Sequence, residues 1–155
     1  MIISLNWIKD FVNLDGIEVD ELTKRFGLST AEIEGVEYKG KEIDQVVVAE
    51  ILSVENHPES QKLHILKVND GSGSPVQVVC GAPNVKVGLK TYFARVGGNV
   101  NGLKIKPAKL AGIESFGMCC SEQELGIGSD NNGIMDITTN AKMGTPLSEI
   151  YPIND

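Results

Sequence analysis

The sequence predicts a mainly β protein: a small antiparallel barrel of about five strands, preceded by two short helices. Three observations predict this fold class. Segments rich in valine, isoleucine and leucine follow one another after residue 40, turn residues separate them, and no long helical pattern lies between them. At 155 residues the chain suits one domain with a small additional part, and it is too short for two full domains.

The first predicted helix begins after Ser4, whose side chain can cap it. Apolar residues then recur with helical spacing from Leu5 to Val12, with Trp7 beside them, and we expect this stripe to be buried. A second helix is predicted from Val19, with acidic residues in its first turn and Gly27 placed to end it. A strand over residues 33–38 leads out of this region.

Strands are predicted over residues 45–54, 62–68, 76–80 and 90–96, with further short strands at 103–106 and 134–137. Glycine, asparagine and proline mark the turns between them. The alternation of apolar residues predicts the barrel core, although a slip of one residue would exchange its faces. The residues expected in this core are Val46, Val48, Leu63, Ile65, Val76, Val78 and Phe93.

The net charge of −7 and the pI near 4.8 argue against nucleic acid as a partner, but the charge is unevenly distributed. Residues 71–113 contain no Asp or Glu and carry six basic side chains, whereas both flanks are acidic. This acid-free window can form a positive surface that attracts phosphate, or it can be an ordinary solvated face. No apolar run is long enough to span a bilayer, so we expect no membrane partner.

Little in the sequence indicates catalysis or a metal site. Lys90-Thr91 follows Leu89, where a phosphate-binding P-loop requires glycine. Cys80, Cys119 and Cys120 form no Cys-x-x-Cys pair, and we expect small buried apolar residues, consistent with a reducing cytoplasm. His57 and His64 do not form a metal-ligand pair with helical spacing, and neither position indicates a catalytic base.

The remaining interpretation is a barrel with a basic strand that also carries aromatic residues. Tyr92 and Phe93 lie between Lys90 and Arg95, so the strand could follow a phosphodiester backbone and offer one ring to a base. Successive side chains on a strand point to opposite faces, so only one of the two rings can face a ligand, and we expect Phe93 inside.

Four ordered blocks, residues 57–63 (HPESQKL), 79–84 (VCGAPN), 104–106 (KIK) and 109–126, resemble the tRNA-binding OB-fold. This domain occurs in the β subunit of bacterial phenylalanyl-tRNA synthetase, in the methionyl-tRNA synthetase C-terminus and in stand-alone tRNA-binding proteins. The resemblance implies a five-stranded Greek-key barrel. Two positions depart from the family pattern: Ala111 stands where a basic residue is common, and Gln61 replaces a usual Asp. The loss of the cation at position 111 weakens the implied phosphate contact.

The opening residues 1–12 and 32–36 resemble the start of the synthetase β subunit. The resemblance implies three parts: the first half of a discontinuous α+β domain at residues 1–39, the tRNA-binding OB-fold at 40–151, and the start of a continuation at 152–155. The chain is therefore expected to be an N-terminal fragment of a longer cytoplasmic subunit.

The implied function is accessory, mostly non-specific and weak binding of tRNA within an α2β2 synthetase that attaches phenylalanine to tRNA with ATP and magnesium. The resemblance places catalysis elsewhere, in the α subunit and further along β, so no catalytic, metal or cofactor residue is expected in this chain. A structural scaffold role and a stand-alone tRNA-binding or chaperone-like OB protein stay open as alternatives. The residues expected to contact RNA are Lys86, Lys90, Tyr92, Arg95, Lys104, Lys106, Lys109, Ser115 and Met118.

Overall fold

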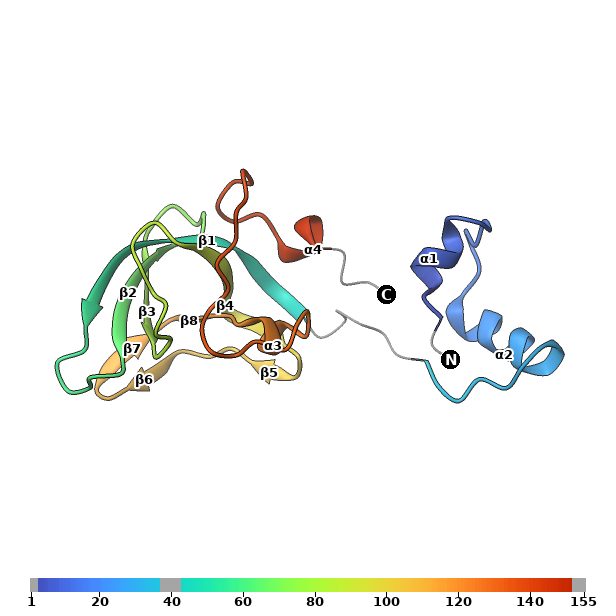
Figure 1. Ribbon diagram of the computed structural model, residues 1–155, viewed down its shortest axis with the longest axis horizontal. Coiled ribbons are helices and arrows are strands. Elements are labelled where there is room, and N and C mark those ends of the chain that lie inside the picture. The colour runs from blue at the N-terminus through green and yellow to red at the C-terminus, as the bar shows by residue number, and fades with distance from the viewer. Residues whose placement is uncertain (1–2, 37–42, 152–155) are drawn as a thin grey trace. The chain divides into compact units, whose positions relative to one another are not determined.

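The structure is a computed structural model, and it describes residues 3–36 and 43–151 (Figure 1). The described residues form two compact units, residues 3–36 and residues 43–151. We describe each unit separately. The interpretation of the first unit as half of a discontinuous domain stays a prediction.

The first unit contains helices α1 (Leu5–Lys9) and α2 (Val19–Ser29). Ser4 caps α1 as predicted, because its Oγ accepts a hydrogen bond from the backbone N–H of Trp7 at 3.1 Å. The expectation that Gly27 ends the second helix is wrong. The helix continues to Ser29, and a single glycine inside a helix costs only about 1 kcal/mol. Residues 31–36 form no strand, and residues 37 and 38 lie outside the described residues.

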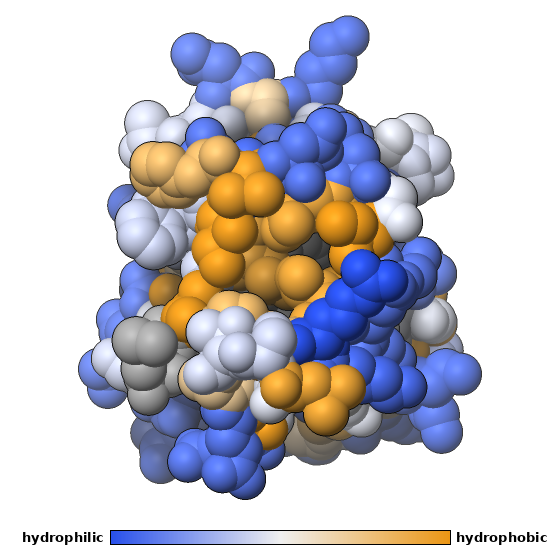
Figure 2. Space-filling model, turned by 90° about the vertical axis from the view of Figure 1, so that its right-hand side faces the viewer, coloured by the Kyte–Doolittle hydropathy of each residue, from blue (hydrophilic) through white to orange (hydrophobic). Residues whose placement is uncertain are grey.

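The apolar stripe of the first helix is not buried, in contrast to our expectation: Leu5 and Ile8 are half-buried, and Phe11 and Val12 are exposed. Trp7 and Phe11 are 62% and 72% exposed and contact each other edge to face, with ring centroids 5.4 Å apart. Helices of five and eleven residues enclose no interior of their own, and α2 buries no residue. In Figure 2, apolar side chains gather on the surface that is turned toward the viewer.

Five strands form the nearly closed barrel of the second unit. Their bounds are β1 (Ile43–Asn56), β2 (His64–Asn69), β3 (Val76–Cys80), β4 (Lys90–Val100) and β8 (Gly117–Cys119). All pairs are antiparallel, in the order β3-β2-β1-β4-β8. The barrel closes between β3 and β8, where the N–H of Phe116 donates to the carbonyl of Gln77 at 2.9 Å. This is the predicted OB-fold barrel.

Shorter elements fill the connection between β4 and β8 and follow the barrel. They are β5 (Leu103–Lys104), β6 (Ala108–Leu110), β7 (Ile113–Ser115), α3 (Glu122–Leu125) and α4 (Leu147–Ile150). The predicted strand at 134–137 is wrong. Its bonds to other backbone groups are isolated, from Met135 to Cys120 and from Ile137 to Lys90, and they form no ladder. Both backbone groups of Ile134 bond the side chain of Asn84 instead.

The barrel has apolar cores on both sides of its wall. The residues that follow β8, 120–151, are called the C-terminal segment. The interior contains Val47, Ile51, Leu66, Val68 and Phe93, whereas Val46, Val48 and Tyr92 pack under the C-terminal segment with Leu125 and Leu147. The predicted core residues Val46, Val48, Val78 and Phe93 are buried, and Leu63, Ile65 and Val76 are only half-buried. On β2, Leu66 and Val68 are the fully buried positions, so the expected face of that strand was shifted by one residue.

Candidate nucleic-acid interface

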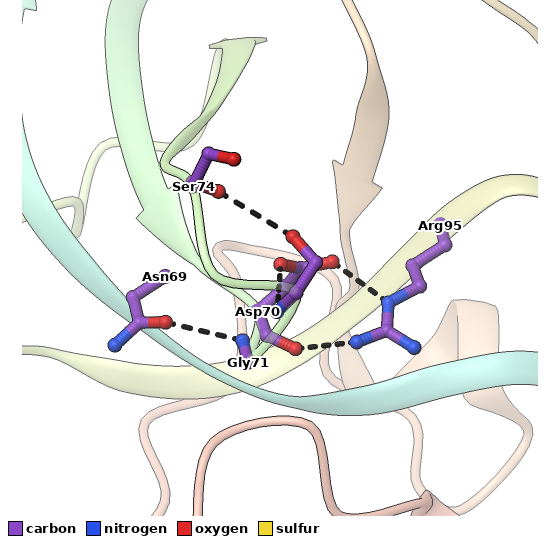
Figure 3. A network of polar contacts seen from close by, with 6 residues as sticks. Asn69, Asp70, Gly71, Ser74 and Arg95 are labelled. Atoms are coloured by element: carbon purple, nitrogen blue, oxygen red, sulfur yellow. Dashed lines mark hydrogen bonds and ion pairs between the residues drawn. The ribbon is translucent and has the colours of Figure 1, made fainter.

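The six cations of the acid-free window lie in different environments, and Arg95 is the most constrained. Its Nε donates to Oδ2 of Asp70 at 2.7 Å, and its Nη2 donates to the Asp70 backbone carbonyl (Figure 3). Asp70 is 2% exposed. Burial alone would raise the pKa of this carboxyl, but hydrogen bonds from Ser72 and Arg95 outweigh it and hold the pKa below the usual 3.8.

The loop that carries Asp70 is ordered by its own side chains. Oδ1 of Asn69 accepts the N–H of Gly71 at 3.1 Å, and Oδ1 of Asp70 accepts the N–H of Ser72 at 3.0 Å (Figure 3). Gly71 has a φ of +80°, and a Cβ there would collide with the carbonyl of Met143. Arg95 therefore joins β4 to a loop that packs closely on the C-terminal segment.

Lys86 and Lys90 also have partners in the C-terminal segment. Lys86 Nζ lies 3.1 Å from Oδ2 of Asp136, in a pair whose side chains are 65% and 55% exposed. Lys90 Nζ donates to the carbonyl of Thr139 at 2.9 Å. The Lys86–Asp136 pair is exposed and therefore weak, so water and salt can compete for it, whereas the Lys90 contact is half-buried.

Lys104, Lys106 and Lys109 are exposed, and none of them forms an ion pair with a described residue. We call these three side chains the lysine rim. Between the first two, Ile105 is buried and exchanges two backbone hydrogen bonds with Gly97 and Gly98. Side chains alternate along an extended segment, so this anchor turns Lys104 and Lys106 outward.

Lys109 lies on the two-stranded sheet of β6 and β7. In the register of this sheet it stands directly opposite Glu114. The turn between the strands consists of Ala111 and Gly112, both with positive φ (45° and 85°). Two-residue hairpin turns that match the twist of the strands require positive φ at both positions.

Three other predicted contact residues are occupied within the protein. Phe93 lies in the barrel interior, as expected, and Tyr92 lies on the opposite face of β4, but Tyr92 is only 4% exposed and so is not open to a ligand there. The reason is that the C-terminal segment covers the second face of β4. The hydroxyl of Ser115 accepts the N–H of Val79 at 3.0 Å and donates to Gly117 at 3.3 Å, and Met118 belongs to β8 and packs on the outer core.

Three further basic or aromatic residues were missed in the sequence. Lys62 lies exposed in the loop 57–63, and Phe116, just before β8, is 39% exposed. Lys67 lies on β2, where its Nζ donates to Oε1 of Gln77 at 3.1 Å. The alternation of Lys67 with the buried Leu66 and Val68 was a signal for an outward side chain, whereas the exposure of Phe116 has none.

The cysteines behave as small apolar residues, as predicted. Cys119 and Cys120 are buried, Cys80 is half-buried, and all three are free thiols. Burial raises the pKa of Cys120 to about 12 and shifts the pKa of Cys119 upward as well. Within residues 3–36 and 43–151, no group of three His, Cys, Asp or Glu side chains could hold a metal ion.

The fold and the lysine rim define a class of protein: an OB-fold barrel with cations on the connection between its fourth and fifth strands. In OB-folds this connection and the loop between the first two strands flank the surface that binds nucleic acid. A family model described as "Putative tRNA binding domain" matches residues 46–146, and the chain belongs to this family.

The chain is homologous to a region of the phenylalanine–tRNA ligase beta subunit. It is 38% identical to that subunit of Fusobacterium nucleatum and 42% identical to that of Anaeromyxobacter dehalogenans, in each case over 156 residues and 100% of this chain. It spans 19% of the length of these relatives. A solved structure of a MetRS-related protein from Pyrococcus horikoshii aligns at 20% identity over 73% of this chain and 97% of its own, with a TM-score of 0.48.

No helix within the described parts of the chain is both long enough and apolar enough to cross a membrane.

Proposed function

We propose that this chain is the tRNA-binding region of a phenylalanine–tRNA ligase beta subunit and that the lysine rim contacts tRNA phosphates. The observation that carries the proposal is that Lys104, Lys106 and Lys109 are exposed and without an ion-pair partner among the described residues. They lie within the family match, on the connection that OB-folds use for nucleic acid.

The contacts should be mostly to phosphate and independent of base sequence. Lysine is a flexible point charge that pairs with phosphate without reading base edges. The aromatic ring first considered for base stacking, Tyr92, is buried, and Phe116 is a half-exposed aromatic just before β8. The acidic flanks oppose the approach of RNA, so the affinity of the chain by itself should be weak.

The larger assembly is part of the same proposal. The homologous region implies a cytoplasmic α2β2 synthetase, in which the α subunit and the rest of β attach phenylalanine to tRNA with ATP and magnesium. We assign that chemistry and those cofactors to parts of the assembly outside these 155 residues. The role proposed for this region is to support aminoacylation by holding tRNA.

The test compares two triple variants that remove the same charge. The first replaces Lys104, Lys106 and Lys109 with alanine, and the matched control replaces the exposed Lys9, Lys24 and Lys142. Binding of tRNA is titrated at several salt concentrations. Loss of three phosphate contacts should reduce the log–log salt slope by about 2, taking roughly 0.7 per phosphate, and the control should keep the native slope.

A scaffold role is the second candidate, and the exposed apolar residues of the helical unit favour it. Trp7, Phe11 and Leu28 are 62%, 72% and 90% exposed, which is typical of a surface that packs on other protein. Equal affinities of the two triple variants, or no detectable tRNA binding by the native chain at low salt, would favour the scaffold over the tRNA-binding role.

A further inference from the structure

His57 joins the two connections that flank the proposed RNA-binding surface. It is 5% exposed, at the start of the loop 57–63. Its backbone N–H donates to the carbonyl of Leu63 at 3.0 Å, and its Nδ1 accepts the N–H of Glu59 at 3.1 Å. Its Nε2 lies 3.3 Å from the carbonyl of Leu110, which is 53 residues away in the sequence.

These contacts assign the hydrogen of the ring. A carbonyl oxygen only accepts, so Nε2 carries the hydrogen and donates to Leu110, while Nδ1 accepts from Glu59. One face of the side chain therefore orders its own loop, and the other holds the end of β6. The two tasks belong to two different nitrogen atoms.

The β6–β7 hairpin is attached to the barrel mainly through β7. Ser115 accepts the N–H of Val79, and the carbonyl of Glu114 accepts a hydrogen bond from Nε2 of Gln77 at 2.9 Å. All three residues of β6 are exposed. Among the hydrogen bonds of the described residues, His57 to Leu110 is the one that joins β6 to the barrel outside the hairpin.

We propose that His57 is a positioning residue for RNA binding: it holds β6 against the loop 57–63 and so fixes the position of Lys109. This inference rests on the proposed function, because Lys109 belongs to the lysine rim. Without the bond to Leu110, the exposed strand keeps its pairing with β7 but loses its second attachment, and Lys109 pays a larger entropic cost when it contacts a phosphate.

Two near-isosteric variants separate the two nitrogen atoms. In His57→Asn the amide oxygen can replace Nδ1 and keep the bond from Glu59, but no donor reaches Leu110. In His57→Gln the longer amide can donate to Leu110, in place of Nε2. The measurements are tRNA affinity at several salt concentrations, amide hydrogen exchange of residues 104–116, and urea unfolding as a control for the fold.

We expect His57→Asn to speed amide exchange in β6. It should also reduce the salt slope by up to about 0.7, the value of one phosphate contact. Over the range from about 50 to 200 mM salt, a slope difference of this size changes the ratio of variant to native affinity about threefold. His57→Gln should restore both properties. In a Lys109→Ala background, His57→Asn should have no further effect on binding, because the residue acts through Lys109.

Native affinity and native exchange in His57→Asn would overturn the inference. An equal loss of affinity with and without Lys109 would also overturn it, and this comparison stays valid even if the variant is less stable. Failure of the proposed function is a different result: the native chain would then bind no tRNA, and the exchange of β6 in His57→Asn would decide the role of His57 by itself.

Discussion

Arg95 and the lysine rim come from the same acid-free window, yet they lie in opposite environments. Arg95 bonds a carboxylate that is 2% exposed and closes a loop onto β4. Lys104, Lys106 and Lys109 are exposed, and they form no ion pair within the described ranges. A charge pattern along the sequence therefore identifies the cations, but the turns of the chain decide which of them bind the protein itself and which are left for a ligand.

The antiparallel topology explains this division. Asp70 is the residue just before the window, and the β2–β3 turn brings it back to β4, where Arg95 lies. Asp136 reaches Lys86 from 50 residues away. The acid-free window thus contains no acidic residue in its sequence, but in the structure acidic side chains from outside it lie against two of its cations. Lys104, Lys106 and Lys109 form no ion pair with a described residue, although Glu114 stands opposite Lys109 in the β6–β7 sheet.

The largest expected effect is on stability, from Arg95→Met. The variant leaves the buried carboxylate of Asp70 without its cation, and we expect a loss of about 2–3 kcal/mol in the free energy of unfolding, below the full value for a buried pair because Arg95 is partly exposed. Urea unfolding measures it. Lys86→Met, which breaks an exposed pair, is the control and should cost less than about 1 kcal/mol. Equal costs would remove the distinction between the two cations.

Acid should weaken the ion pair between Arg95 and Asp70. The pKa of Asp70 is lowered in the folded state, so its stabilisation is present above 3.8 and is lost as the pH falls toward the folded-state pKa. Below pH 3.8 this one group should contribute a loss of up to about 1.4 kcal/mol per pH unit. Asp70→Asn should be less stable at neutral pH and should show a shallower acid limb. An unchanged acid limb in that variant would contradict this assignment.

A substitution in the Ala111-Gly112 turn between β6 and β7 should increase stability. Ala111 has a φ of +45°, a conformation that asparagine adopts more readily than alanine. We expect Ala111→Asn to raise the free energy of unfolding by about 0.5–1 kcal/mol, because Asn-Gly suits a tight hairpin turn. The control is Ala108→Asn in β6, which should bring no gain. A loss of stability in Ala111→Asn would contradict the idea that the positive φ of Ala111 destabilises the turn.

The smallest expected effect is on affinity, from Glu114→Gln. Glu114 stands opposite Lys109, so its negative charge opposes the approach of a phosphate. Removing that charge should strengthen tRNA binding about twofold to threefold at low salt, and the gain should fade as salt screens the pair. Glu149→Gln, on α4, is the control for net charge. A gain of the same size in both variants would assign the effect to overall charge.

The sequence predicted the barrel well because its strands carry strong local signals. The bounds of β3 agree with the prediction, and β1 and β4 extend a few residues beyond it. The strands β6, β7 and β8 have three residues each, too few for a periodic pattern. Segment 134–137 has a strand composition, but no neighbouring strand offers it a ladder.

The candidate site was less predictable because long-range contacts decide it. The local sequence predicts a surface aromatic at Tyr92, but the C-terminal segment covers this side chain. It likewise predicts a free cation at Arg95, but Asp70 pairs with it in the folded chain. Lys104 and Lys106 could be predicted, since they alternate with the apolar Ile105 on a short extended segment. The role of His57 depends on a contact with Leu110 that no local pattern contains.

The most direct test of the central claim is the salt slope of tRNA binding in three chains: the native chain, Arg95→Met, and the triple alanine variant of Lys104, Lys106 and Lys109. If cations of the same window divide into structural and binding groups, Arg95→Met should keep the native salt slope at a temperature where the variant is folded. In the triple variant the salt slope should be smaller than the native slope by about 2. A loss of slope in Arg95→Met as large as in the triple variant, or a native slope in the triple variant, would contradict the account.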